Sequence, residues 1–262
     1  MTDKQVAIIT GAASGLGLEM AKQLAGKYQL FLIDRDQAQL HQQTADLSDC
    51  QCFICDLADS NAIDQVIEQI SQLQPDIALL INNAGITHRS LAKITAQQVI
   101  EKVMRVDYFA PVQLTQGLLP LLVRSQAKVV NISSMAGWMP VMARAGYCAA
   151  KSAMHQYFET FRAEMAPQNI EVLMVYPSFI DTPIEQNALS GTGDKTRHAR
   201  STVGKMRSSQ WMVKQIVRAI QTGKQRLFPD KFTYFSSLLY RFWPSLYMRM
   251  MTKRFASELE VR

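Results

Sequence analysis

Three side chains that could transfer a proton lie close together in the sequence. Tyr147 follows Ser134 by thirteen positions, and Lys151 follows Tyr147 by four. A tyrosine and a lysine at this spacing share one face of a helix, one turn apart. Many surface helices carry such a pair, so its meaning depends on the elements around it. A site becomes credible if the fold brings these groups to a pocket.

Short apolar runs alternate with helical patterns along most of the chain. The runs are typical of buried strands, and the patterns between them have helical spacing. This alternation predicts an α/β fold, with a doubly wound parallel sheet of the Rossmann type in a three-layer αβα arrangement. Ligands in such folds bind at the carboxyl ends of the strands. The strands are expected at 5–10, 28–34, 51–56, 76–85, 127–134 and 170–177, and the helices at 16–27, from Ser60 onward, at about 95–122 and at 145–166.

A glycine-rich turn, TGAASGLG (10–17), joins the first predicted strand to the first predicted helix. Glycines allow a tight turn and a close approach of the backbone to a pyrophosphate, and the helix N-terminus supplies N–H groups. Asp34 ends the second strand, where a carboxylate can accept hydrogen bonds from ribose hydroxyls and repel a 2′-phosphate. NAD is therefore the expected cofactor. Arg35 could pair with a phosphate, which keeps NADP as the alternative.

Several motifs together resemble the short-chain dehydrogenase/reductase family over roughly residues 4–183. They are the glycine turn, Asp56 after the third strand, NNAG (82–85), the Ser134, Tyr147 and Lys151 set, and Thr182. The resemblance implies a cofactor site. Its members would be Gly11, Ser14, Gly15, Leu16, Gly17, Asp34, Arg35, Asp56, Leu57, Asn83, Ala84, Gly85, Tyr147, Lys151, Pro177 and Thr182.

The resemblance also implies catalytic roles, with Tyr147 as general acid for reduction or base for oxidation and Ser134 bonded to the substrate oxygen. An ammonium about 4 Å from the phenol would lower the pKa of Tyr147 by roughly three units, toward roughly 7. Two positions depart from the family pattern. Ser178 replaces a usual glycine, and Asp107 stands where a catalytic asparagine is usual. Asp107 would either oppose the lysine electrostatically or accept from the water that the asparagine would hold.

Length and composition are those of an ordinary globular protein, with 262 residues, 48% hydrophobic and 19% charged. We expect one domain over 1–262. The N-terminus does not resemble a signal peptide, and no apolar run reaches the roughly 18 residues of a membrane span, so a cytoplasmic location is expected. Cys50, Cys52 and Cys55 are close in sequence but lack a fourth ligand nearby, and we interpret them as reduced thiols.

Two segments follow the part that resembles the family. Residues 183–209 are expected to form a substrate lid, either a solvated loop or a basic mouth for an acidic substrate, with Lys195, Arg197, Arg200, Lys205 and Arg207. Residues 228–262 form an extension rich in aromatic and basic residues, in which Arg241 and Pro244 argue against a membrane span. Packing over the pocket or a second subunit and peripheral membrane contact are both open interpretations.

The sequence therefore predicts an NAD(P)-dependent oxidoreductase acting on an alcohol or carbonyl compound, with a lipophilic substrate favoured by the apolar extension. The alternative is a non-catalytic nucleotide sensor or membrane-peripheral regulator on the same fold, which only Asp107 favours. We expect a homo-oligomer, no nucleic-acid partner and no metal, with contact to a membrane through the C-terminal segment as a further interpretation.

Overall fold

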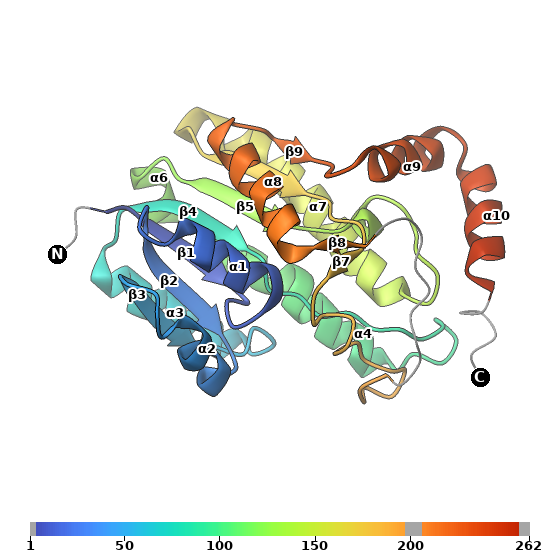
Figure 1. Ribbon diagram of the computed structural model, residues 1–262, viewed down its shortest axis with the longest axis horizontal. Coiled ribbons are helices and arrows are strands. Elements are labelled where there is room, and N and C mark those ends of the chain that lie inside the picture. The colour runs from blue at the N-terminus through green and yellow to red at the C-terminus, as the bar shows by residue number, and fades with distance from the viewer. Residues whose placement is uncertain (1–3, 197–205, 257–262) are drawn as a thin grey trace.

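One parallel sheet of seven strands organises the chain. The computed structural model describes residues 4–196 and 206–256, and Figure 1 shows the sheet between its helices. The strand order is β3-β2-β1-β4-β5-β6-β9. The strands are β1 (Val6–Thr10), β2 (Gln29–Asp34), β3 (Cys50–Ile54), β4 (Ile77–Asn82), β5 (Lys128–Ile132), β6 (Glu171–Val175) and β9 (Arg226–Leu227).

Helices cover both faces of this sheet, so the predicted doubly wound α/β fold is confirmed. Side chains of α1, α2 and α8 pack on one face, and those of α3, α5 and α7 pack on the other. The helices are α1 (Gly15–Leu24), α2 (Gln37–Thr44), α3 (Ser60–Leu73), α4 (Gln97–Met104), α5 (Ala110–Gly117), α6 (Leu119–Arg124), α7 (Ala145–Met165), α8 (Ser209–Gln221), α9 (Lys231–Phe242) and α10 (Pro244–Arg254).

The strand order reverses between β1 and β4. Ile8 in β1 lies between Phe31 of β2 and Leu80 of β4, and all three side chains are buried. Chains that leave neighbouring strands to opposite faces of a sheet open a crevice at the carboxyl ends. The turn after β1 and the loop after β4 therefore meet at this edge.

The long helix expected over about 95–122 is interrupted, which corrects the prediction. A π-helical turn, η1 (Arg105–Phe109), separates α4 from α5, and Pro120 lies in the first turn of α6. Proline lacks an N–H and cannot continue the preceding helix. The π turn leaves no comparable pattern in the sequence, and such turns are frequent at functional sites. Asp107 lies in its middle.

Several predicted strands end earlier than expected, and several elements were missed. β4 ends at Asn82 and β5 ends at Ile132, so the residues after them belong to loops. In α2 only Leu40 and Thr44 are buried, which leaves little apolar periodicity to detect. The amphipathic α8 and the two-residue β9 were not predicted either.

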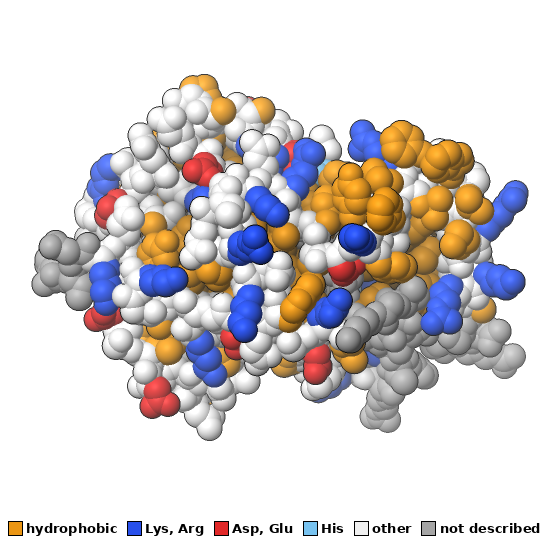
Figure 2. All heavy atoms as spheres, turned by 45° about the horizontal axis from the view of Figure 1, so that its top comes forward, with side chains coloured by type: hydrophobic (Ala, Val, Ile, Leu, Met, Phe, Trp, Pro, Cys, Tyr) orange, Lys and Arg blue, Asp and Glu red, His pale blue; other side chains and the backbone are white. Residues whose placement is uncertain are grey.

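The C-terminal helices α9 and α10 lie beyond the sheet, at the end of the molecule far from β3 (Figure 1). Exposed hydrophobic side chains and basic groups gather over this end (Figure 2). Across the described ranges, no helix combines the length and apolar character that crossing a bilayer requires.

A candidate active site at the carboxyl ends of the strands

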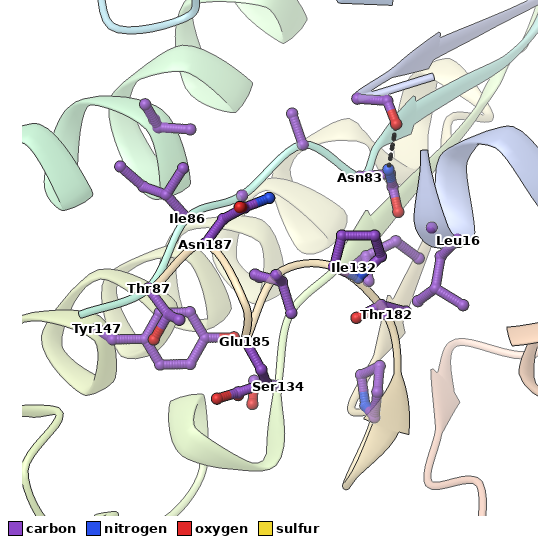
Figure 3. Close-up of a pocket in the computed structure, with 18 of the residues that line it drawn as sticks. Leu16, Asn83, Ile86, Thr87, Ile132, Ser134, Tyr147, Thr182, Glu185 and Asn187 are labelled. Carbon is purple, nitrogen blue, oxygen red and sulfur yellow. Dashed lines mark hydrogen bonds between the residues drawn. The ribbon is translucent and has the colours of Figure 1, made fainter. Parts of the chain in front are cut away.

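A pocket of about 300 Å³ opens at the carboxyl edge of the sheet. Its walls contain every residue predicted for the site except Gly17 and Asp107, and Figure 3 shows side chains from several loops converging on it. Gly17 and Asp107 lie just behind the walls. The predicted residues in the walls are Gly11, Ser14, Gly15, Leu16, Asp34, Arg35, Asp56, Leu57, Asn83, Ala84, Gly85, Ser134, Tyr147, Lys151, Pro177 and Thr182.

The turn between β1 and α1 is a cradle that only glycines can form. Gly11 and Gly15 have φ angles of +68° and +56°, a region that favours glycine. A Cβ on Gly17 would lie 2.1 Å from the carbonyl oxygen of Gly11. Ser14 precedes α1 without a side-chain hydrogen bond to the helix, so the first N–H groups remain available to an anion. This cradle fits a dinucleotide pyrophosphate.

Thr10, which the sequence analysis did not single out, ties this turn to the loop after β4. Its Oγ1 accepts hydrogen bonds from the backbone N–H groups of Asn83 (2.9 Å) and Ala84 (3.0 Å). The Asn83 amide in turn donates to the carbonyl oxygens of Thr10 and Gly11, at 2.8 and 3.3 Å. The NNAG segment therefore braces the glycine turn.

Two carboxylates mark the far end of the pocket. Asp34 Oδ2 accepts a hydrogen bond from the N–H of Ala13 at 2.9 Å, which fixes the carboxylate beside the glycine turn. Asp56 Oδ1 accepts from the N–H of Ala58 at 3.0 Å. Arg35 also lines the pocket. Negative charge and one cation thus meet where an adenosine ribose would lie.

Ser134 and Tyr147 face each other at the opposite end of the pocket. Ser134 lies two residues beyond β5, and its Oγ accepts from the N–H of Ala136 at 3.1 Å at the start of the 3₁₀ turn η2 (Met135–Gly137). Tyr147 lies in the first turn of α7, and its ring points toward Ser134 (Figure 3). Because β5 ends at Ile132, Ser133 and Ser134 both lie beyond the strand, and both residues line the pocket.

Lys151 in the pocket wall and Asp107 behind it form a buried ion pair. Lys151 Nζ lies 3.3 Å from Asp107 Oδ2 and donates to the carbonyl oxygen of Ile132 at 3.1 Å. Asp107 Oδ1 accepts from the N–H of Ile86 at 2.8 Å. Within the described residues, Oδ2 has no partner with hydrogen-bond geometry. Burial raises the pKa of Asp107, which the Lys151 charge and the Ile86 N–H oppose.

The pKa of Tyr147 moves in the direction opposite to the sequence expectation. Burial raises this pKa, the charge of Asp107 raises it further, and a hydrogen bond with Ser134 lowers it. The Lys151 ammonium lies 5.9 Å from the ring centre of Tyr147 and is paired with Asp107 instead. The expected fall toward neutral pH therefore does not occur in this arrangement.

His88 positions the start of α7 and was not predicted to do so. Its fully buried ring accepts a hydrogen bond from the N–H of Gly146 through Nε2 at 2.9 Å, and Nδ1 lies 3.1 Å from Ser90 Oγ. Burial, assisted by the charge of Arg144, lowers the pKa of His88 to about 4. A neutral imidazole thus holds the residue next to Tyr147.

An ion pair between Arg144 and Glu185 lines the pocket near Tyr147. Arg144 Nη2 is 2.8 Å from Glu185 Oε2, and Arg144 Nη1 donates to Thr87 Oγ1 at 3.0 Å. The pair joins the residue before α7 to the predicted lid.

The basic residues predicted for the mouth do not line the pocket where they are described. Lys195 and Arg207 are absent from its walls, and Arg207 lies over the Trp211 ring. The other members, Arg197, Arg200 and Lys205, fall outside the described residues.

Ser178, at the position where the family usually has glycine, connects the site to the C-terminal helices. Its hydroxyl donates to Asp230 Oδ2 at 2.9 Å, and Asp230 caps the N-terminus of α9. Thr182 faces the glycine turn, because a Cβ on Gly15 would lie 3.5 Å from its Cβ.

The fold and the site define a nicotinamide-dinucleotide-dependent oxidoreductase. The family model "short chain dehydrogenase" matches residues 5–192, and the chain belongs to this family. It is 32% identical to a dehydrogenase/reductase SDR family member 7B of Xenopus laevis, over 95% of this chain and 81% of the relative. It is 33% identical to a dehydrogenase/reductase SDR family protein 7-like of Drosophila melanogaster, over 95% of this chain and 80% of the relative.

Solved structures share the fold. A short-chain dehydrogenase from Streptomyces avermitilis matches with a TM-score of 0.80 at 24% identity, covering 98% of this chain and 99% of its own. A short chain dehydrogenase from Burkholderia cenocepacia in complex with NADP matches with a TM-score of 0.79 at 20% identity, covering 96% and 99%.

Proposed function

We propose that this protein interconverts a secondary alcohol and a carbonyl compound, with Ser134, Tyr147 and Lys151 as the groups that handle the proton and the substrate oxygen. The observation that carries the proposal is the Tyr147 hydroxyl, which faces Ser134 inside the pocket that also contains the glycine cradle. When bound, the nicotinamide cofactor donates or accepts the hydride.

In the reductive direction, the Tyr147 hydroxyl gives its proton to the carbonyl oxygen as the carbon receives the hydride. The phenol is protonated at neutral pH, as a proton donor must be, and its raised pKa makes it a weaker acid than a free tyrosine. Ser134 lies at the same end of the pocket and holds the substrate oxygen by a hydrogen bond. The phenolate then regains a proton from solvent, which closes the cycle.

Lys151 and Asp107 have supporting roles in this proposed chemistry. The ammonium lies on the pocket wall, where it would bind the nicotinamide ribose and stabilise a phenolate. Asp107 holds Lys151 and the N–H of Ile86 in place. We therefore assign Asp107 a positioning role in which its charge also tunes Tyr147.

NAD is the proposed cofactor, with NADP as the alternative. Asp34 is fixed beside the cradle with its negative charge in the pocket, which disfavours a 2′-phosphate. Arg35 is the one feature beside it that favours NADP. Titration of the purified protein with NADH and with NADPH, followed by transfer of protein fluorescence to the cofactor, tests this preference.

A lipophilic substrate fits the other end of the pocket. Met135, Val141 and Phe179 supply apolar walls there, beside the Arg144–Glu185 pair. Apolar walls with a few placed polar groups are typical of small-molecule sites. Homo-oligomer formation and a reducing compartment, which suits the four free thiols, are further parts of this proposal.

The deciding experiment is a screen of ketones and secondary alcohols of increasing chain length, with both cofactors. Tyr147→Phe keeps the ring and removes only the proton donor, so we expect turnover to fall roughly 100-fold or more while NADH binding is unchanged. Cofactor binding without turnover of any carbonyl or alcohol would favour the alternative, a non-catalytic nucleotide sensor. The buried Asp107–Lys151 pair is the observation that favours the nucleotide-sensor alternative.

A further inference from the structure

Helix α9 buries two hydroxyl side chains against the protein and leaves several aromatic rings exposed. Thr233 and Ser237 face inward with 0% and 2% of their surface exposed, whereas Phe235 and Phe242 are 61% and 64% exposed. Residues at these spacings lie on opposite sides of a helix. An ordinary surface helix buries its apolar stripe. In α9, Leu239 and Tyr240 are only partly buried against the protein, and the most exposed rings face away from it.

The inward-facing hydroxyls of α9 have hydrogen-bond partners. The Thr233 hydroxyl donates to Asp230 Oδ1 at 2.9 Å, and the Ser237 hydroxyl donates to the carbonyl oxygen of Tyr234 at 2.6 Å. Asp230 also accepts from the Ser178 hydroxyl. The buried hydroxyls therefore have partners, and the start of α9 is tied to the loop after β6. Burying these groups carries little penalty because each is satisfied.

Helix α10 extends the exposed apolar surface. Trp243, Leu246 and Met250 are 62%, 50% and 54% exposed. On its inner side, Tyr247 is buried and donates to the carbonyl oxygen of Pro140 at 3.1 Å. We call the exposed set the outer aromatic face, and Figure 2 shows hydrophobic side chains gathered at this end of the molecule. It consists of Phe235, Phe242, Trp243, Leu246 and Met250.

Basic side chains surround the outer aromatic face. Five are exposed along the two helices, namely Lys231, Arg241, Arg249, Lys253 and Arg254. Asp230 is the one acidic residue between 228 and 256, and both of its carboxylate oxygens are engaged at the helix cap. The surface is therefore apolar and strongly cationic at once.

We propose that the outer aromatic face docks on the surface of an anionic lipid bilayer. Aromatic rings flanked by lysine and arginine are the composition of helices that lie in the membrane interface, where the rings enter the headgroup region and the cations meet anionic lipids. A second copy of this chain fits the outer aromatic face less well, because a two-fold interface would place the basic residues of one subunit next to the same basic residues of the other.

Docking on this face brings the substrate end of the pocket close to the lipid. A small cavity lies under α9 and α10, and Met135, Val141 and Phe179 line both this cavity and the pocket. Phe232 and Tyr247 close it from the helices. A lipophilic substrate could then pass from the bilayer through this cavity to the pocket, and this step rests on the proposed function. The docking proposal rests only on the composition of the outer aromatic face and the basic residues around it.

The test is sedimentation of the full chain with vesicles. One set consists of phosphatidylcholine, and the other of phosphatidylcholine mixed with phosphatidylglycerol. We expect binding to the mixed vesicles that weakens as salt screens the charges. Absence of binding, or equal binding to neutral vesicles, would overturn the proposal.

Paired variants separate the two contributions. Phe235→Ser with Phe242→Ser should weaken vesicle binding roughly tenfold or more, since each ring loses its apolar contact. Arg249→Glu with Lys253→Glu should abolish the preference for anionic lipid. The matched control, Ile54→Ser with Leu73→Ser, removes hydrophobic side chains that are 42% and 50% exposed elsewhere and should leave binding unchanged.

Two further measurements prevent a misreading. Vesicle binding by Phe235→Ser with Phe242→Ser that equals that of the parent would show that the outer aromatic face is not a membrane surface. The same conclusion would follow if the parent did not bind vesicles and this double variant converted a dimer to a monomer. Turnover of a short, water-soluble ketone should be equal in all these variants, because none touches the pocket. If the parent protein does not turn over this ketone, that result contradicts the proposed reaction and does not affect the conclusion about vesicle binding.

Discussion

The Lys151 ammonium lies 3.3 Å from the Asp107 carboxylate, and the two side chains are only 3% and 0% exposed. In the site predicted from the sequence, the same ammonium would have acted mainly on Tyr147. Because a carboxylate shares it, the lysine cannot lower the tyrosine pKa without opposition. In the proposed mechanism, the pair therefore affects the pH range in which Tyr147 would serve as donor or base.

Replacing Asp107 with asparagine should release this opposition. The amide oxygen of Asn can still accept from the N–H of Ile86, so the π turn is kept. We expect the pH at which alcohol oxidation is half maximal to fall by about one unit, because a carboxylate that raises the pKa of Tyr147 is gone. Carbonyl reduction at neutral pH should be unchanged or faster.

The measurement for this substitution is the pH profile of oxidation at saturating cofactor. Glu101→Gln, which removes an exposed carboxylate from the neighbouring α4, is the matched control and should leave the profile in place. A profile for Asp107→Asn that superimposes on that of the parent would remove Asp107 from the mechanism.

Replacing Asp34 with asparagine should shift cofactor preference toward NADPH. The substitution removes the charge that repels a 2′-phosphate and leaves Arg35 beside it. We expect the ratio of NADH to NADPH affinity to fall roughly tenfold. Fluorescence titration measures both constants, and Asp46→Asn, an exposed carboxylate nearby in the sequence, serves as control. An unchanged ratio would mean that Asp34 only fixes the N–H of Ala13.

Much of the fold and of the pocket could be predicted because the motifs are local. The glycine turn, Asp34 and the NNAG segment each follow a buried strand directly, so strand order alone brings them together. The site residues that were missed depend on contacts between distant segments. Thr10 acts through Asn83, 73 positions away, and His88 acts through Gly146, 58 positions away.

The other differences between prediction and structure have physical causes that the sequence pattern does not indicate. The π turn around Asp107 changes the helical period for five residues only. Helix α9 leaves its most exposed rings facing away from the protein, and its start is held by the hydrogen bond between Ser178 and the capping Asp230. The pKa of Tyr147 depends on how much water burial removes, and only the packed structure specifies that.

The stability of the protein should fall as pH falls from about 6.5 to about 4, partly through His88. In the folded state its pKa is lowered to about 4, whereas the unfolded value is about 6.5. Between these two pH values, His88 is protonated in the unfolded chain and neutral in the folded chain. The unfolding free energy should therefore drop by about 3 kcal/mol, with no further loss from this residue below pH 4.

Denaturant unfolding at several pH values measures this dependence. His88→Gln keeps an acceptor for the N–H of Gly146 and cannot be protonated in this range, so its slope should be shallower than that of the parent. His155, whose pKa burial also lowers, will keep its own share of the slope. His41→Gln, on the exposed side of α2, should retain the parent slope, and an equal slope in His88→Gln would contradict the assignment.

The Arg144–Glu185 pair should couple the start of α7 to the lid. The two side chains are only 11% and 21% exposed, so removing either charge leaves the other poorly solvated. We expect Arg144→Met and Glu185→Gln each to reduce the free energy of unfolding by roughly 1–3 kcal/mol. The double variant should lose less than the sum of the single variants by roughly 0.5 kcal/mol or more.

A second ion pair provides the reference for this cycle. Lys4 and Asp49 are 2.7 Å apart with side chains 36% and 30% exposed, so their coupling should be smaller. Kinetics add a readout that stability does not give, because Arg144 and Glu185 lie at the substrate end of the pocket. Breaking the pair should raise KM for the substrate and leave NADH affinity unchanged. Additive losses with an unchanged KM would show that the lid is held by its backbone bonds to the segment after β4, such as Leu189 N–H to Thr87 at 2.9 Å.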